Sequence, residues 1–164
     1  MRKILSFLLS VMLLAGICGA AWAESEQPAD EWTVMIYLCG TDLESGQFQC
    51  ATHNLQQIAE TIPSDSVNVV IETGGTKEWH AEETVGIKIA NDKLQRWTWG
   101  PEGFTLVEEE PEACMSHAET LSEFIRWSTE KYPAKQHMLL LWDHGGGSNS
   151  GLICDENYGM TIMP

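Results

Sequence analysis

A histidine followed by three glycines is the clearest candidate for chemistry in this sequence. His144 comes after the apolar run 138–142 and Asp143, and residues 145–147 are all glycine. A short apolar run that ends in glycines is typical of a buried parallel strand that opens into a loop at its carboxyl end, where open α/β sheets hold their active sites. A histidine in that position can act as a general base or acid near neutral pH. The alternative is a structural histidine at the end of the strand.

The neighbours of His144 suggest different roles. Successive side chains of a strand point to opposite faces, so we expect Asp143 to bind backbone amides of the loop rather than hold the imidazole beside it. The backbone amide of Gly145 is a candidate oxyanion donor. No Lys-Ser/Thr pair follows the glycines, which excludes a phosphate-binding P-loop.

A histidine that works as a general base needs a nucleophile, and the cysteines of this chain are weak candidates. Cys154 is flanked by carboxylates, which raise a thiol pKa rather than lower it. Cys39 ends an apolar strand and is expected to be a packed thiol. Together with Cys50 and Cys114, these two cysteines have no zinc-ligand spacing. The sequence does not determine whether or how the four form disulfides, and we expect most of them to be small buried side chains.

The amino-terminal residues 1–23 have the pattern of a secretory signal. Arg2 and Lys3 precede an apolar stretch over 4–17, and Ala21-Trp22-Ala23 is a small-x-small cleavage motif. We expect an exported protein, with a retained membrane anchor as the alternative. The whole chain has a formal net charge of −15, and loss of the two basic residues makes it −17. Such a surface repels nucleic acid and anionic membranes; it would attract Lys/Arg-rich peptides, or simply keep the protein soluble.

Hydrophobic periodicity predicts an alternation of strands and helices after a polar linker at 24–31. A hairpin that leaves the main sheet, a solvated connection over 106–115 with the acidic run 108–110, and a short returning strand near Cys154 complete the prediction. The capping box Ser116–Glu119 marks a helix start, and 161–164 resembles the entry to another helix. The expected strands are 32–39, 67–72 and 138–142, the expected helices run from Asp42 or Ser45 to Pro63 and from Ser116 to Pro133, and the hairpin comprises 87–89 and 94–99.

This order predicts an α/β fold, a three-layer α/β/α sandwich with a mainly parallel sheet, over residues 32–164. We expect the domain to be incomplete at its carboxyl end, with later strands absent from this sequence.

Three segments, 32–44, 73–76 and 141–147, resemble the amino-terminal half of the clostripain-like cysteine peptidases in order and separation. The resemblance implies a caspase- and gingipain-like sandwich and a Cys–His dyad that cleaves peptides after Arg or Lys. His144 matches the catalytic histidine and Gly145 the oxyanion amide beside it. The family's nucleophilic cysteine ends the next core strand, near an acidic pocket, and no such segment is present in this chain. Calcium dependence is also implied, but no calcium ligands can be assigned.

These observations leave three hypotheses. The first is the front part of a secreted clostripain-like endopeptidase that acts on Arg/Lys-containing peptides or proteins and is inactive without its nucleophile. The second is a secreted binding protein that kept the fold and lost the reaction. The third is a light chain that pairs with a separate heavy chain. The DNA that follows the Pro164 codon would discriminate among them.

Overall fold

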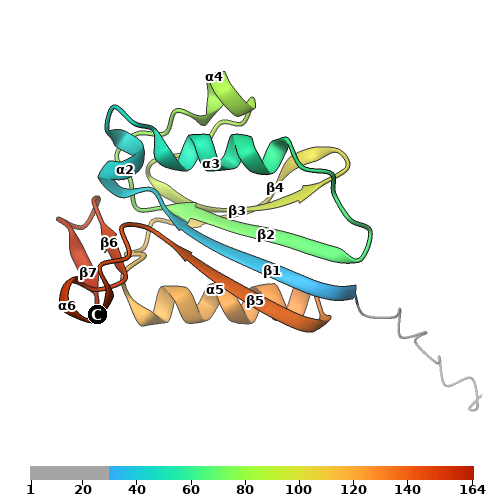
Figure 1. Ribbon diagram of the computed structural model, residues 1–164. Helices are drawn as coiled ribbons and strands as arrows, with labels where there is room; N and C mark the ends of the chain where they lie inside the picture. The colour runs from blue at the N-terminus through green and yellow to red at the C-terminus, as the bar shows by residue number, and fades with distance from the viewer. Residues whose placement is uncertain (1–29) are drawn as a thin grey trace, which may run out of the picture.

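The computed structural model describes residues 30–164 (Figure 1). The expected signal segment and most of the expected linker lie outside the described residues, although Asp30 and Glu31 already belong to the first strand. No helix within 30–164 is both long and apolar enough to cross a membrane.

A mixed five-stranded sheet forms the centre of the domain, in the order β4-β3-β2-β1-β5. β1 pairs in parallel with β2 on one side and with β5 on the other, whereas β2–β3 and β3–β4 are antiparallel. The strands are β1 (Asp30–Cys39), β2 (Val67–Gly74), β3 (Lys93–Gly100), β4 (Gly103–Pro111) and β5 (Ala134–Trp142).

Helices cover both faces of this sheet, which confirms the predicted three-layer α/β/α class (Figure 1). Alternating residues of β1 divide the core: Tyr37 packs with Phe124 of α5 (Ala118–Lys131), while Leu38 packs with Leu55 of α3 (Cys50–Ala59). The short helix α4 (Ala81–Val85) lies on the α3 side through Ala81. The central strand β1 therefore contributes side chains to the hydrophobic core on both faces of the sheet.

The carboxyl ends of β1, β2 and β5 meet at one edge, and small elements gather there (Figure 1). α2 (Thr41–Ser45) follows β1, and α6 (Gly147–Ser150) follows β5. A two-stranded antiparallel sheet, β6 (Ile153–Asp155) with β7 (Thr161–Met163), closes this end.

The expected long helix after β1 is broken into α2 and α3. Gln49 adopts the left-handed conformation with a φ of 47°, and α3 ends at Ala59. Phe48 and Ile62 lie within the expected helix but outside α3, and their side chains are 68% and 93% exposed. The buried residues Ala51, Thr52 and Leu55 all lie inside α3.

The predicted hairpin is correct in one strand only, since 94–99 lies within β3, and it is wrong in its other strand and in its place. Residues 87–89 form no strand; β3 pairs with β4 instead, and this hairpin extends the main sheet beyond β2. Most of the expected solvated connection is β4. Its acidic residues are held by cations of the chain itself: Arg96 contacts Glu108 at 2.9 Å and Glu110 at 3.7 Å.

Two helix signals were also wrong. No side chain caps α5, which begins after His117; the buried hydroxyl of Ser116 lies 3.0 Å from the sulfur of Cys114 instead. Residues Thr161–Met163 form β7 rather than the start of a helix, because they complete the backbone pairing of β6.

Candidate active site at the carboxyl ends of β1 and β5

His144 forms a hydrogen-bonded pair with a carboxylate that the sequence analysis did not select. The ring Nε2 of His144 lies 2.8 Å from Oδ1 of Asp42, a residue of α2. The parallel register of β1 and β5, which sets Leu38 opposite Trp142, brings the two following loops together. The side chains are 44% and 56% exposed, so the pair is open to solvent.

The pair changes the acidity of Asp42. The hydrogen bond from His144 is the main cause that lowers the pKa of this carboxyl below its ordinary value, and the hydroxyl of Thr41 contributes in the same direction. Asp42 is therefore ionised across the neutral range and can orient the imidazole and stabilise its protonated form.

Asp143 performs the role that we expected of it. Its carboxylate accepts the backbone N–H of His144 at 2.5 Å and the backbone N–H of Cys154 at 2.6 Å. It thus links the loop after β5 to β6. Burial raises the pKa of Asp143, against the lowering effect of these two amides.

The glycines after His144 give the loop its shape. Gly145 has a φ of 68°, a left-handed conformation that most residues adopt only with strain, and a Cβ added there would meet no neighbour. Its exposed backbone stands directly beside His144. The oxyanion role of its amide stays a prediction.

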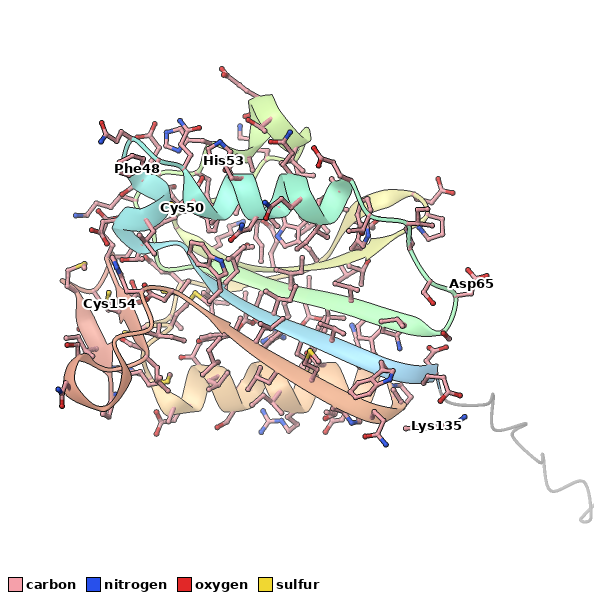
Figure 2. All side chains as sticks on the ribbon, viewed as in Figure 1. Phe48, Cys50, His53, Asp65, Lys135 and Cys154 are labelled. Atoms are coloured by element: carbon pink, nitrogen blue, oxygen red, sulfur yellow. The ribbon has the colours of Figure 1, made fainter. Side chains whose placement is uncertain are left out.

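The cysteines separate into packed thiols and one thiol near the histidine. All four cysteines of the described residues are free thiols, and Cys39 and Cys114 are buried as expected. Burial raises the pKa of Cys39, whose Sγ lies 3.4 Å from the carbonyl oxygen of Cys154. Cys154 belongs to β6, at the end of the domain where the small β6–β7 sheet lies (Figure 2). Its ligating atom and those of Asp143 and His144 all lie within 4.8 Å of one another.

Cys154 has the wrong electrostatics for a nucleophile at neutral pH. Burial is the largest cause that raises the pKa of its thiol, and the negative charges of Asp143 and Asp42 raise it further. The carboxylates that raise this pKa are thus Asp143 and Asp42, rather than Asp155 and Glu156, which follow Cys154 in the sequence. Asp155 and Glu156 act elsewhere, as anchors of the β6 segment.

Sequence reasoning missed these two anchors, which hold the segments around the candidate site. The buried carboxylate of Asp155 accepts the backbone N–H of Met115 at 2.7 Å and that of Asn157 at 2.9 Å. The carboxylate of Glu156 accepts the hydroxyl of Ser45 at 2.9 Å, which ties it to α2. Acidic residues next to a strand end were the available signal, because loop amides need such acceptors.

A hollow of about 350 Å³ lies beside the pair, between the loop after β5 and the β6–β7 sheet. Its lining combines polar groups with apolar side chains: Asp42, His144 and Cys154 with Leu152, Met160 and Ile162. A convergent polar set in an apolar hollow is what a small substrate group requires.

A second exposed feature lies along β5, the edge strand of the described sheet. Met138, Leu139 and Leu140 are 47%, 37% and 46% exposed on this strand. Next to it, Leu140 and Trp142 line an apolar hollow of about 330 Å³ with Ile36, Leu38, Leu55 and Ile58. Exposed apolar area of this kind marks a contact surface.

Comparison with solved structures shows that this chain has the fold of clostripain-like cysteine proteases. A Bacteroides fragilis cysteine protease superimposes with a TM-score of 0.52 at 15% identity, covering 72% of this chain and 92% of that chain. A clostripain from Bacteroides thetaiotaomicron, in complex with the peptide inhibitor BTN-VLTK-AOMK, gives 0.51 at 14% identity, over 73% of this chain and 95% of that one. A secreted C11 cysteine protease from the same species, bound to an irreversible peptide inhibitor, gives 0.55 at 14% identity, but only 36% of its chain is covered.

No protein-family model matches this chain, and no curated protein matches it in sequence. At these identities the likeness to solved structures establishes the fold, and the chemistry must be argued from the site.

Proposed function

We propose that this chain is the histidine-bearing part of an exported clostripain-like cysteine endopeptidase that cleaves after Arg or Lys. The observation that carries the proposal is the Asp42–His144 hydrogen bond of 2.8 Å, placed where β1 and β5 end, within a fold shared with clostripain-like proteases. The lysine in the peptide inhibitor of one such clostripain supports the basic specificity.

In this mechanism His144 takes the proton of a cysteine thiol and later gives it to the leaving amine. Asp42 is a positioning residue, because it holds the imidazole through Nε2 and stabilises the imidazolium that forms. The amide of Gly145 donates a hydrogen bond to the oxyanion of the tetrahedral intermediate, and loss of one such donor typically slows the reaction by about 10²–10³.

The nucleophile in our proposal is a thiol on a further strand that pairs with β5. Cys154 and Cys39 both have pKa values raised by burial and nearby carboxylates, which keeps them protonated. The exposed edge of β5 and the apolar hollow beside Leu140 and Trp142 supply a surface on which such a strand and its helix can pack. This surface also favours our second candidate, a light chain that pairs with a separate heavy chain.

The light-chain form has additional support from chain lengths. This chain covers 92% and 95% of two solved protease chains, so in those structures a chain of similar extent exists as a separate polypeptide. A non-catalytic binding protein would not require the Asp42–His144 pair, and we do not favour it.

The test is to purify the protein from its native host by a tag on this chain and to assay peptides with Arg or Lys before the scissile bond. We expect hydrolysis, and labelling of a cysteine outside residues 30–164 by a lysyl acyloxymethylketone. His144→Ala should abolish hydrolysis, while the matched control His53→Ala, on the exposed face of α3, should leave it intact.

Two outcomes would overturn parts of the proposal. Absence of hydrolysis in the purified assembly would refute the peptidase function. Labelling of Cys154, with loss of hydrolysis in Cys154→Ser, would refute the assignment of the nucleophile. The DNA after the Pro164 codon gives an independent check, since a frame that continues into a strand ending in cysteine supports a single precursor.

A further inference from the structure

We propose that Asp143, His144 and Cys154 form a binding site for a thiophilic divalent cation such as Zn²⁺, a site that includes the proposed catalytic histidine. The ligating atoms of the three side chains converge within 4.8 Å of one another, and Oδ1 of Asp143 lies 3.9 Å from Sγ of Cys154. Zn–S and Zn–O or Zn–N bonds of about 2.3 and 2.0–2.2 Å give ligand separations near 3.5 Å in a tetrahedral site. Small movements of the side chains therefore complete the geometry.

The carboxylate ligand is already fixed by the backbone. Each oxygen of Asp143 accepts one amide N–H, from His144 and from Cys154, and a carboxylate oxygen has a second lone pair for a metal. The same bonds hold the two other ligand residues close to it. Hydrogen bonds to the residues that coordinate the metal are a regular feature of metal sites in proteins.

The imidazole ligand is oriented as well. Asp42 holds the ring of His144 through a hydrogen bond of 2.8 Å, the carboxylate–histidine arrangement that supports metal-bound histidine. Two carboxylates, Asp42 and Asp143, surround the thiol of Cys154, so the local charge favours a cation. On binding, the metal–sulfur bond replaces the S–H bond and the proton passes to water.

The donor set selects the kind of metal. One sulfur, one nitrogen and one carboxylate oxygen suit Zn²⁺ or Co²⁺, whereas calcium requires about six to eight oxygen ligands. Asp143, His144 and Cys154 are the three ligating residues found to converge within residues 30–164. Because only one of them offers oxygen, they do not fit the calcium that the family resemblance implies. Three protein ligands leave a fourth position open, and two of the three, His144 and Cys154, line the hollow that also contains Met160 and Ile162.

A metal on His144 would withdraw the imidazole from proton transfer. This consequence rests on the proposed peptidase function, whereas metal binding itself does not. The site would then act as a reversible inhibitory switch at the catalytic histidine.

The test is a Co²⁺ titration of the full chain, purified without a histidine tag under reducing conditions. We expect a thiolate charge-transfer band and the intense visible bands of tetrahedral cobalt, both removed by Zn²⁺. Cys154→Ser should abolish the charge-transfer band, and His144→Ala should weaken Co²⁺ binding by more than the roughly 10–100-fold typical of outer-shell changes. The matched controls Cys50→Ser and His53→Ala should bind as the unchanged chain does, and circular dichroism verifies the fold of each variant.

The result that overturns the site is a charge-transfer band that persists in Cys154→Ser, or no band at millimolar Co²⁺. A separate arm measures hydrolysis by the assembly from the native host with added Zn²⁺, followed by a chelator. Bands without any metal-free hydrolysis would leave the site standing and refute the proposed function. Hydrolysis without cobalt bands would support the proposed function and refute the metal site. Hydrolysis that Zn²⁺ does not inhibit would refute the inhibitory switch.

Discussion

Glu44 is a buried carboxylate that fixes α2, and with it Asp42, to the rest of the domain. The side chain is fully buried and accepts three hydrogen bonds: from the backbone N–H of Thr52 at 2.8 Å, from the hydroxyl of Thr52 at 2.5 Å and from the backbone N–H of His80 at 2.9 Å. Gln49 provides no side-chain cap for α3, so Glu44 takes that role from outside the helix. We predict that Glu44→Ala and Glu44→Gln lower stability to different extents.

The magnitudes follow from the donors left behind. Glu44→Ala leaves two backbone N–H groups without their partner, that of buried Thr52 and that of part-buried His80, each at about 1–3 kcal/mol, while the hydroxyl of Thr52 can rotate away. We expect a loss of about 3–5 kcal/mol, a large part of the roughly 5–15 kcal/mol typical of domains. Glu44→Gln keeps one oxygen but turns an amide NH₂ toward the N–H of Thr52 or His80, so its cost is about 1–3 kcal/mol.

Urea unfolding followed by tryptophan fluorescence measures these losses. Equal slopes of unfolding free energy against urea concentration in the variants and the unchanged protein would show that unfolding exposes the same surface in each. Glu83→Gln, at an exposed glutamate of α4, is the matched control and should change stability by less than about 0.5 kcal/mol. Amide hydrogen exchange adds a local readout, because the N–H groups of Thr52 and His80 should lose protection in Glu44→Ala.

The reasoning is refuted if Glu44→Ala unfolds at the same urea concentration as Glu83→Gln. It is also refuted if the amides of Thr52 and His80 exchange as slowly in the variant as in the unchanged protein. In either case the carboxylate would not be the partner that these donors need.

Three further predictions concern groups with distinct physics. His144→Ala removes the hydrogen bond that chiefly lowers the pKa of Asp42, so an NMR titration should show that pKa rising toward its ordinary value; an unchanged pKa would contradict the pair. Burial raises the pKa of Glu72 from 4.5 to about 7, so the folded state binds more protons than the unfolded state between these values. Stability should therefore fall as pH rises through that window, by up to about 1.4 kcal/mol per pH unit, and Glu72→Gln should flatten the profile in urea unfolding. Gly75→Ala should cost about 2–4 kcal/mol, because Gly75 has a φ of 70° and its added Cβ meets a buried sulfur, whereas Gly86→Ala, with a φ of 78° and open space, should cost only about 1–2 kcal/mol by thermal unfolding.

The parallel strands β1 and β5 could be predicted because each contains a continuous apolar run, and the helix that became α5 has a clear apolar face. Burial does not follow from such a run: residues 135–140 of β5, the edge strand of the described sheet, are exposed. β4 was missed because Glu108 and Glu110 hide its pattern. Arg96 on the neighbouring strand binds both carboxylates, and that pairing is a property of strand register rather than of local sequence.

The Asp42–His144 pair could not be predicted from spacing, since 102 residues separate its members. A signal was nevertheless present. Asp42 stands three residues after the end of β1 and His144 two residues after the end of β5, so two parallel neighbours would bring them to the same edge. The register of β1 and β5 decides the contact, and register depends on packing that no local pattern contains.

The acidic character of this chain is partly structural at the site, which bears on how a basic substrate would be recognised. Asp143, Asp155 and Glu44 all accept backbone N–H groups that would otherwise be unpaired, so their charges are engaged within the loops. Asp42 is more exposed, but it is already bonded to His144. A lysine or arginine side chain therefore finds no free buried carboxylate among these four. If the proposed function is correct, specificity for basic residues requires a carboxylate other than these four.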